Sequence, residues 1–473
     1  MQQRWKVLFI TSIGVFMASL DLFIVNIAFP QIATDFHGVK LSDLSWVLNA
    51  YSIVVAAVLV PFGRFADRVG RKRVFIAGVL GFTLASLLAA AAPTVPLLVA
   101  ARVLQAAAGA LMIPASLGII LSVFPASERA VAVGAWSAVA GVAAALGPPV
   151  GGLLLSLSWR WIFLVNLPIG LLTAAVALRS LPESREREGG ARPDALGAVV
   201  LAAGIALLTT AIVKGPDWGW SDWRIAAAFA AAAVLIAGFG WRSAHHPAPV
   251  IELALLRVRS FAVGNLATMV FFAGFAAMLL GGVLLLTEVW GYSALHAGVA
   301  LVPGPLSAAI FAAPAGKLGS RIGQRPVGVA GGLAFGSGFI WLIERVGVHA
   351  NYAGDVLPGL IVGGIGVGLL VGSLPGAVTA ELPDDRFATG TAVFGMARQL
   401  GSAIGVAILI ALLANPAPGE LLAGLRRGWW FMVGTGVATS LISLALAPKE
   451  REPLGATVLP GAALDVAAAG EKI

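Results

Sequence analysis

The chain has 473 residues, of which 59% are hydrophobic and 11% are charged, and its mean hydropathy is +0.93. A soluble domain of this length needs far more charge to cover its surface, so the composition indicates a membrane protein. The net charge of +8 does not indicate nucleic-acid binding, because the basic residues lie in short segments between apolar runs and form no single face. The chain has no cysteine, which excludes disulfides, cysteine-ligated metals and thiol catalysis.

Apolar runs long enough to cross a bilayer as helices, about 20 residues each, occur 14 times along the chain. We expect helices at residues 7–30, 44–63, 74–92, 96–119, 131–155, 160–181, 196–213, 225–241, 262–287, 298–316, 326–345, 356–379, 388–413 and 429–447. The first run contains Asp21 and lacks a small-residue cleavage site, so we interpret it as a retained helix. The sequence therefore predicts an all-α polytopic membrane protein with 14 transmembrane helices.

The lysines and arginines predict how these helices are oriented. With the N-terminus in the cytoplasm, inner loops and tails hold 22 of the 31 Lys and Arg residues, outer loops hold seven, and two lie within helices. Positive residues favour the cytoplasmic side. We therefore expect a multi-pass protein of the bacterial cytoplasmic (inner) membrane, with both termini in the cytoplasm and the lipid bilayer as its surroundings.

A short sequence repeat divides the chain into two halves. Residues 63–70 and 316–323 share the pattern of Gly, four residues, Arg, one residue and Gly. The two copies occupy equivalent places in two six-helix bundles if the seventh and eighth helices are an insertion, and parallel repeats of this kind are one transporter architecture. We expect an N-terminal bundle at 1–182, a linker with the two extra helices at 183–259, a C-terminal bundle at 260–448 and a disordered cytoplasmic tail at 449–473.

Asp21 and Arg102 are charged residues inside predicted helices, where a charge costs roughly 2.5–3.5 kcal/mol. At a rise of about 1.5 Å per residue, both lie about 21 Å from the inner face of a core about 30 Å thick. We expect them to interact, directly or through water or Gln105, which is one turn from Arg102. Desolvation and a nearby cation act in opposite directions on a carboxyl group, so Asp21 is suited to proton exchange. A static pair that fixes helix packing is the alternative.

Arg398 lies near the middle of the predicted helix 388–413 and is followed by Gln399. It either faces a central cavity and contacts substrate, or caps backbone carbonyls at a helix break. The five histidines show no metal-binding spacing, so we expect no metal site.

Two segments have features of moving parts. Glycines and prolines within 131–155 are expected to bend that helix and leave a smooth face for a neighbour, although ordinary tight packing is the alternative. Asp67 lies among basic residues after the second helix, and we expect this cluster to latch neighbouring helices, with a simple topology signal as the alternative. The latch residues are Gly63, Asp67, Arg68, Gly70, Arg71, Lys72 and, in the second copy, Arg321.

These segments resemble the major facilitator superfamily, and within it the 14-span drug:proton antiporter branch, over nearly the whole chain. Asp21 with Asn26 resembles the first-span motif of that branch, and residues 63–72 resemble the loop signature of the superfamily. Arg102 and Gln105 resemble a fourth-span motif linked to proton transfer, although Ala106 stands where a glycine usually follows.

Two more segments extend the resemblance. Residues 159–170 resemble a segment common in the 14-span branch. The fifth predicted helix resembles an antiporter motif associated with export, and the residues that carry this likeness are Gly141, Gly147, Pro148, Gly151 and Gly152. The second loop copy has Ser320 where the first has Asp67, so we expect the two latches to be unequal.

The expected function is proton-coupled antiport that exports hydrophobic, neutral or monocationic drugs or toxic compounds by alternating access. Asp21, Arg102 and Gln105 are assigned to proton coupling, and Asn26, Arg398 and Gln399 are assigned to the substrate cavity. Some family exporters of dications carry an extra carboxylate in the tenth span, and residues 298–316 have none, which disfavours dications as substrates. We expect a monomer that uses the proton gradient and no cofactor.

Other functions remain open or are disfavoured. A proton-coupled uptake symporter and an exporter of an endogenous metabolite or lipid are the alternatives. An enzyme is disfavoured because the predicted helices contain no histidine or paired acids for catalysis. A receptor or scaffold without transport activity is disfavoured by the intact Asp21 and loop motifs.

Overall fold

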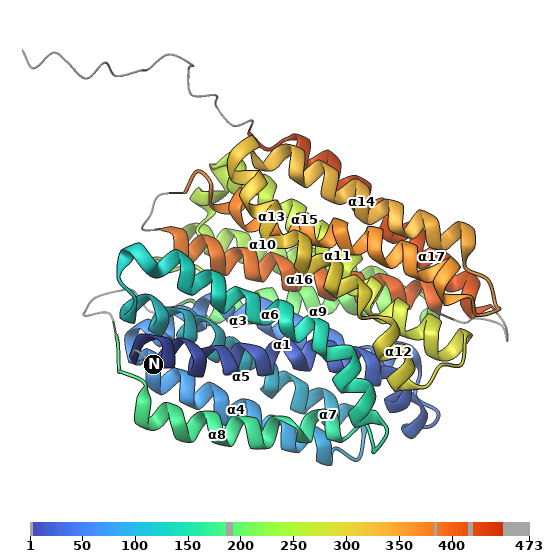
Figure 1. Ribbon diagram of the computed structural model, residues 1–473, viewed down its shortest axis with the longest axis horizontal. Helices are drawn as coiled ribbons and strands as arrows, with labels where there is room; N and C mark the ends of the chain where they lie inside the picture. The colour runs from blue at the N-terminus through green and yellow to red at the C-terminus, as the bar shows by residue number, and fades with distance from the viewer. Residues whose placement is uncertain (1–2, 186–192, 383–385, 415–419, 448–473) are drawn as a thin grey trace, which may run out of the picture.

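The computed structural model describes residues 3–185, 193–382, 386–414 and 420–447, and in these residues the regular structure is helical, with no strand (Figure 1). The predicted tail at 449–473 lies outside the described residues, as do residues 186–192 of the predicted linker. Thirteen helices of the described part are long and apolar enough to cross a membrane. α17, with 24 residues, supplies the fourteenth span, so the all-α, 14-helix prediction is confirmed.

The helices follow one another in the predicted order. The first six spans are α1 (Gln3–Asp35), α2 with α3 (Leu41–Leu44, Trp46–Val69), α4 (Arg71–Ala91), α5 (Val95–Val123), α6 (Ala126–Leu155) and α7 with α8 (Trp161–Leu164, Asn166–Ser180). The two extra spans are α9 (Ala195–Trp218) and α10 (Trp223–His245), and a 3-10 turn follows at Leu253–Arg257.

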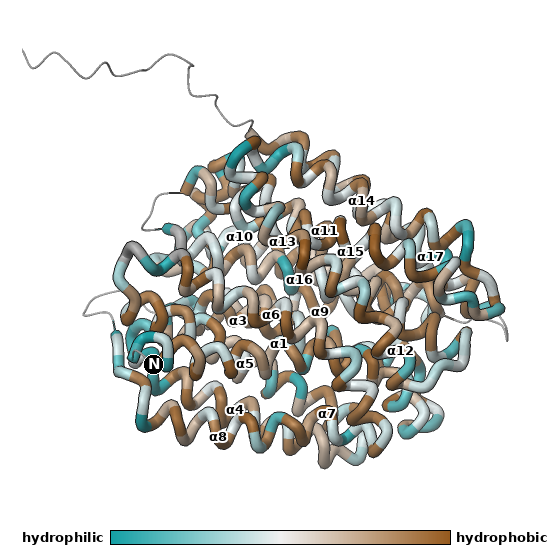
Figure 2. The backbone as a smooth tube through the Cα atoms, viewed as in Figure 1, coloured by the Kyte–Doolittle hydropathy of each residue, from teal (hydrophilic) through white to brown (hydrophobic). Residues whose placement is uncertain are grey.

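The last six spans begin with α11 (Arg259–Leu284), which continues as a π-helical turn (Leu285–Val289). The others are α12 with α13 (Ala294–Ala300, Pro303–Ile322), α14 (Gln324–Arg345), α15 (Leu357–Thr379), α16 (Phe387–Leu413) and α17 (Leu421–Leu444); a second π-helical turn (Tyr352–Val356) precedes α15. Figure 2 shows hydrophobic residues along the helices and most hydrophilic residues near their ends, as a bilayer requires.

Glycines let helices of the C-terminal half approach closely. A Cβ atom at Gly338 of α14 would meet the backbone of Gly359 and Gly363 on α15, and one at Gly366 of α15 would meet the backbone of Gly331 and Phe335 on α14. The hydrophobic effect does not drive helices together in lipid, so close backbone contact and van der Waals packing stabilise such pairs.

The two halves meet mainly along two helix pairs, α3 with α16 and α6 with α12, and less extensively between α1 and α11 and between α6 and α13. We call the end of the bundle where α1 begins the N-terminal end, and the opposite end the far end; in Figure 1 these lie at the left and right. Near the far end a Cβ at Gly298 of α12 would collide with the carbonyl of Pro148 on α6. Toward the N-terminal end, a Cβ at Gly134 or Gly141 of α6 would meet nothing within 4 Å. The α6–α12 contact is therefore close at the far end, whereas Gly134 and Gly141 are exposed and have open space beside them.

The extra helix α9 lies against α3 of the first half and α16 of the second, and α10 packs mainly on α9. At the far end Lys214 of α9 pairs with Asp43 (2.7 Å) and Asp217 (3.3 Å). At the start of α9, the Asp194 side chain accepts hydrogen bonds from Gly197 N and from Arg242 of α10. The insertion is thus fixed by polar contacts at both ends.

Candidate functional site

A buried polar network surrounds Asp21 of α1 and Arg102 of α5, and neither side chain is exposed. Arg102 donates to the carboxylate of Asp21 and to Oε1 of Gln105 (2.5 Å), and its Nε donates to the backbone carbonyl of Val47 (3.1 Å). Gln105 Nε2 donates to Asp21 Oδ1 (2.9 Å) and to Ser86 Oγ (2.9 Å). The structure therefore brings the three residues assigned to proton coupling into direct contact.

Residues that the sequence did not single out complete this network. The guanidinium of Arg102 lies over the ring of Tyr51, 4.4 Å from its centroid. Asn166 of α8 donates to Ser86 of α4 (3.3 Å), so helices α1, α3, α4, α5 and α8 all contribute. Tyr51 is one of only three tyrosines in the chain and stands in an apolar run, which is a usable signal. Ser86 has no such signal, because small polar residues are common in spanning helices.

The chemistry of this network is that of a neutralised ion pair. Two opposite charges removed from water are tolerable only when hydrogen bonds satisfy them as well. A proton on Asp21 would cancel its charge and end the ion pair, and Arg102 would then be held by Gln105, the Val47 carbonyl and the ring of Tyr51. Protonation therefore changes which contacts hold α1 against α5, and a movable proton can bias the packing of the helices.

Arg398 of α16 has a different environment, although it also lies within a membrane-spanning helix. Its side chain is partly exposed, and the guanidinium lies 5.8 Å from the centroid of Phe272 on α11. In the described part of the chain, no ion pair or hydrogen bond engages this guanidinium.

The other two residues assigned to a substrate cavity differ from Arg398. Gln399 is buried, with 4% of its surface exposed. Asn26 is half-buried and its Nδ2 donates to the carbonyl of Leu22 in its own helix (2.7 Å). Arg398 is thus the member of this group with both exposed surface and an unused set of donors.

The end of α3 and the start of α4, joined at Gly70, form a charged cluster within the N-terminal half. Asp67 pairs with Arg71 (2.7 Å), and Lys72 Nζ donates to the carbonyl of Leu178 on α8 (2.8 Å). Gly70 has a φ of 126°, which disfavours any side chain, and a Cβ there would meet the carboxylate of Glu183. The described contacts of this cluster join it to the segment after α8.

The remaining latch residues have separate positions. Gly63 packs near Pro114 of α5, and Arg68 is exposed. Arg321 is exposed near the end of α13, far along the chain from the Asp67 cluster.

The glycine and proline residues of α6 pack against both halves. A Cβ at Gly147 would collide with Phe23, and one at Gly151 would collide with Ile27, so these glycines allow α6 to approach α1. Gly152 approaches the backbone of Ala294 on α12 in the same way. Pro148 and Pro149 lie inside the continuous helix.

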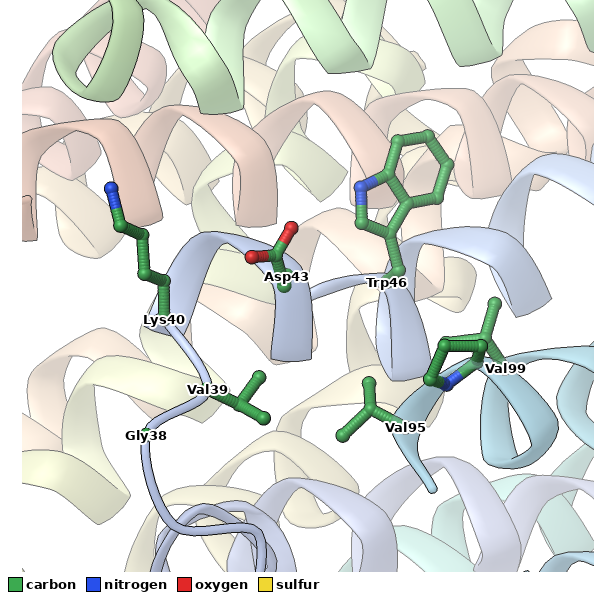
Figure 3. A pocket seen from close by; sticks show the side chains of 8 residues that line it. Gly38, Val39, Lys40, Asp43, Trp46, Val95 and Val99 are labelled. Atoms are coloured by element: carbon green, nitrogen blue, oxygen red, sulfur yellow. The ribbon is translucent and has the colours of Figure 1, made fainter.

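A depression of about 600 Å³ lies at the far end, apart from the buried network (Figure 3). Its lining residues are Gly38, Val39, Lys40, Asp43, Trp46, Val95, Pro96 and Val99. Trp46 directly precedes Val47, whose carbonyl accepts a hydrogen bond from Arg102. The described residues include no group of three or more His, Asp or Glu side chains able to hold a metal ion.

Comparison with known proteins places this arrangement among membrane transporters. The chain is 34% identical over 457 residues to a probable actinorhodin transporter of Streptomyces coelicolor, covering 93% of this chain and 78% of that protein. It is 30% identical to a tetracenomycin C resistance and export protein of Streptomyces glaucescens, covering 87% and 76%. It is also 29% identical to a riboflavin transporter of Clostridioides difficile, covering 88% and 89%.

The fold agrees with solved transporter structures. A POT family transporter in complex with 5-aminolevulinic acid superposes with a TM-score of 0.68 at 14% identity, covering 92% of this chain and 94% of that one. At this identity the likeness concerns the fold alone. The model of the family described as Major Facilitator Superfamily matches residues 11–405. With its helix order, its two contacting halves and its relatives in agreement, this chain belongs to the major facilitator superfamily of membrane transporters.

Proposed function

We propose that this protein exports hydrophobic drug-like molecules across the bacterial cytoplasmic membrane in exchange for protons. The observation that carries the proposal is the fully buried contact of Asp21 with Arg102 and Gln105. An acid at this depth is costly unless it has a partner or a task. Here its partner is a second charge on another helix, so gain or loss of one proton changes how two helices are held together.

The proposed cycle is alternating access between the two halves. If both termini lie in the cytoplasm, as the basic residues predict, the open space beside Gly134 and Gly141 of α6 lies toward the inside and the close α6–α12 contact lies toward the outside. Substrate would enter from the cytoplasm between the halves, and rocking would open the far end. A proton from outside would then neutralise Asp21, weaken its hold on Arg102 and favour return to the inward-facing arrangement.

The relatives support export as the direction. Two of them are named for transport or export of the antibiotics actinorhodin and tetracenomycin C. The riboflavin transporter supports the runner-up, uptake or export of a metabolite. Residues 298–316 contain no carboxylate, so neutral and monocationic compounds are admitted as substrates. We propose that the protein works as a monomer driven by the proton gradient with no cofactor.

Transport into everted membrane vesicles tests the proposal. With an inside-acid pH gradient, the wild type is expected to accumulate substrate, whereas Asp21→Asn should lose accumulation against a gradient while retaining exchange of labelled for unlabelled substrate. Asp222→Asn, in the α9–α10 loop, is the matched control and should behave as wild type. Accumulation by Asp21→Asn equal to that of wild type would contradict proton coupling at this residue.

A further inference from the structure

Arg102 and Arg398, which both lie away from the ends of their spanning helices, differ in whether their charge is balanced. Arg102 contacts Asp21, Gln105 and the Val47 carbonyl. Arg398 contacts the face of Phe272, and among the described residues no acid or hydrogen-bond acceptor engages its guanidinium. A guanidinium has five donors in a planar fork. The Arg398 side chain is partly exposed, so donors that no described protein group engages are open to the acceptor oxygens of a ligand.

Aromatic rings cover the side of Arg398 that faces the C-terminal half. Phe272 contacts Phe275, with their centroids 5.5 Å apart, and both also contact Phe271. Phe271 continues the group to Phe335 of α14 at 5.5 Å. Phe275 is partly exposed and Phe272 is 8% exposed, so the ring that Arg398 contacts adjoins a second ring with exposed surface. Aromatic rings stack well on flat apolar ligands.

The net charge of this region favours anions. Asp21 and Arg102 cancel each other in their direct contact, so the pair presents little net charge to a molecule between the halves. Arg398 adds one uncompensated positive charge. A cationic compound would meet repulsion there, and in a medium of low polarity that repulsion is poorly screened.

We propose that Arg398 binds an acidic oxygen, carboxylate or phenolate, of a planar aromatic substrate whose rings lie against Phe272 and Phe275. This deepens the proposed function by naming its substrate class, and it rests on that function only in treating the space between the halves as the substrate site. The guanidinium supplies a bidentate, charge-assisted contact to the oxygens, and the phenylalanines supply the apolar surface. Among the compounds that the sequence admits, monocations are then the disfavoured ones.

Three anthracene probes that share one ring system test the proposal: anthracene-9-carboxylate, 9-anthracenemethanol and 9-(aminomethyl)anthracene. Their equilibrium binding to the purified full-length protein is measured at pH 7 by probe fluorescence. The wild type is expected to bind the carboxylate about 10- to 100-fold more tightly than the amine, the range expected for one charge-assisted hydrogen-bonded contact. Equal affinity for the three probes, or a preference for the amine, in the wild type would overturn the proposal without any variant.

Variants then assign the preference to Arg398. Arg398→Gln should lose the preference for the carboxylate and leave binding of the alcohol nearly unchanged, and Arg398→Lys should keep most of the preference. Ser402→Ala, one turn further along α16, is the matched control and should bind like wild type. An unchanged preference in Arg398→Gln, or an equal loss for all three probes, would refute a role for the charge.

The outcome is separable from the proton-coupling experiment. Asp21→Asn should keep the carboxylate preference at equilibrium, because binding here uses no gradient. If Arg398→Gln keeps the preference while Asp21→Asn loses accumulation, the substrate class is wrong and proton coupling stands. The opposite pair of results would retain the substrate class and remove the coupling.

Discussion

The buried pair of Asp21 and Arg102 makes a quantitative prediction that separates function from stability. Replacing Arg102 by Met leaves Asp21 fully buried without its ion-pair partner, and replacing Asp21 by Leu does the same to Arg102. Removing one partner of a buried pair typically costs about 3–5 kcal/mol of unfolding free energy. Each single variant is expected to lose that amount, because neither side chain has any exposed surface through which water could replace the lost partner.

The double variant Asp21→Leu with Arg102→Met should be far more stable than the sum of the single changes. Exchange of a whole buried ion pair for apolar residues of similar size is often neutral or stabilising. We therefore expect the unfolding free energy of the double variant to lie within about 1 kcal/mol of that of the wild type, whereas additive changes would lower it by about 6–10 kcal/mol. Gradient-driven transport should be lost completely.

Reversible unfolding of the purified variants in mixed detergent micelles, followed by tryptophan fluorescence, measures these free energies. The double-mutant cycle reports the coupling directly. If the double variant loses as much unfolding free energy as the two single variants together, the contacts of Gln105, Val47 and Ser86 need the ion pair in order to form, and the pair then stabilises the fold. The view that the charges serve transport at little benefit to stability would then be refuted.

Three further predictions concern other parts of the molecule. Gly298→Ala should destabilise the closed far end by about 1–3 kcal/mol because its Cβ meets the carbonyl of Pro148, whereas Gly141→Ala, with nothing within 4 Å, should be neutral in the same unfolding assay. Lys214→Met should cost about 1.5–3 kcal/mol, since Asp217 keeps only 7% exposure and loses its closest cation; an unchanged unfolding midpoint would contradict this. Export of a monoanion against one proton moves two charges, so a potential of 100 mV should contribute about 4.6 kcal/mol, against about 2.3 for a neutral compound; equal voltage dependence in flux measurements on liposomes would count against an anionic substrate.

Hydropathy predicted the number and order of the helices but not their ends. The predicted helix 7–30 extends from Gln3 to Asp35, and the predicted helix 298–316 is part of α12 and α13, which together run from Ala294 to Ile322. The apolar run marks the part of a helix that lies in hydrocarbon, whereas backbone hydrogen bonds continue into polar residues at both ends. The interruption between α12 and α13 has no clear hydropathy signal.

The depth of a charge was the most informative site signal in the sequence. Counting residues from the helix ends placed Asp21 and Arg102 at one level, and the structure joins them directly. The same counting could not predict the carbonyl of Val47 as a partner, because a backbone acceptor leaves no mark in the sequence. It also could not separate Arg398 from Gln399, which adjoin in sequence but differ in burial, since that depends on how α16 is turned against its neighbours.

The inserted segment connects the two halves through additional contacts, apart from those that the halves make with each other. Glu252, in the segment between α10 and α11, pairs with Arg64 of α3 (3.1 Å) and with Arg386 before α16 (2.5 Å). The Glu252 carboxylate thus contacts an arginine from each half, Arg64 of α3 and Arg386 before α16, the two helices on which α9 packs. Each pair is partly exposed and contributes at most about 1 kcal/mol. Packing of α9 on α3 and α16 is therefore the stronger connection between the halves on this side of the molecule.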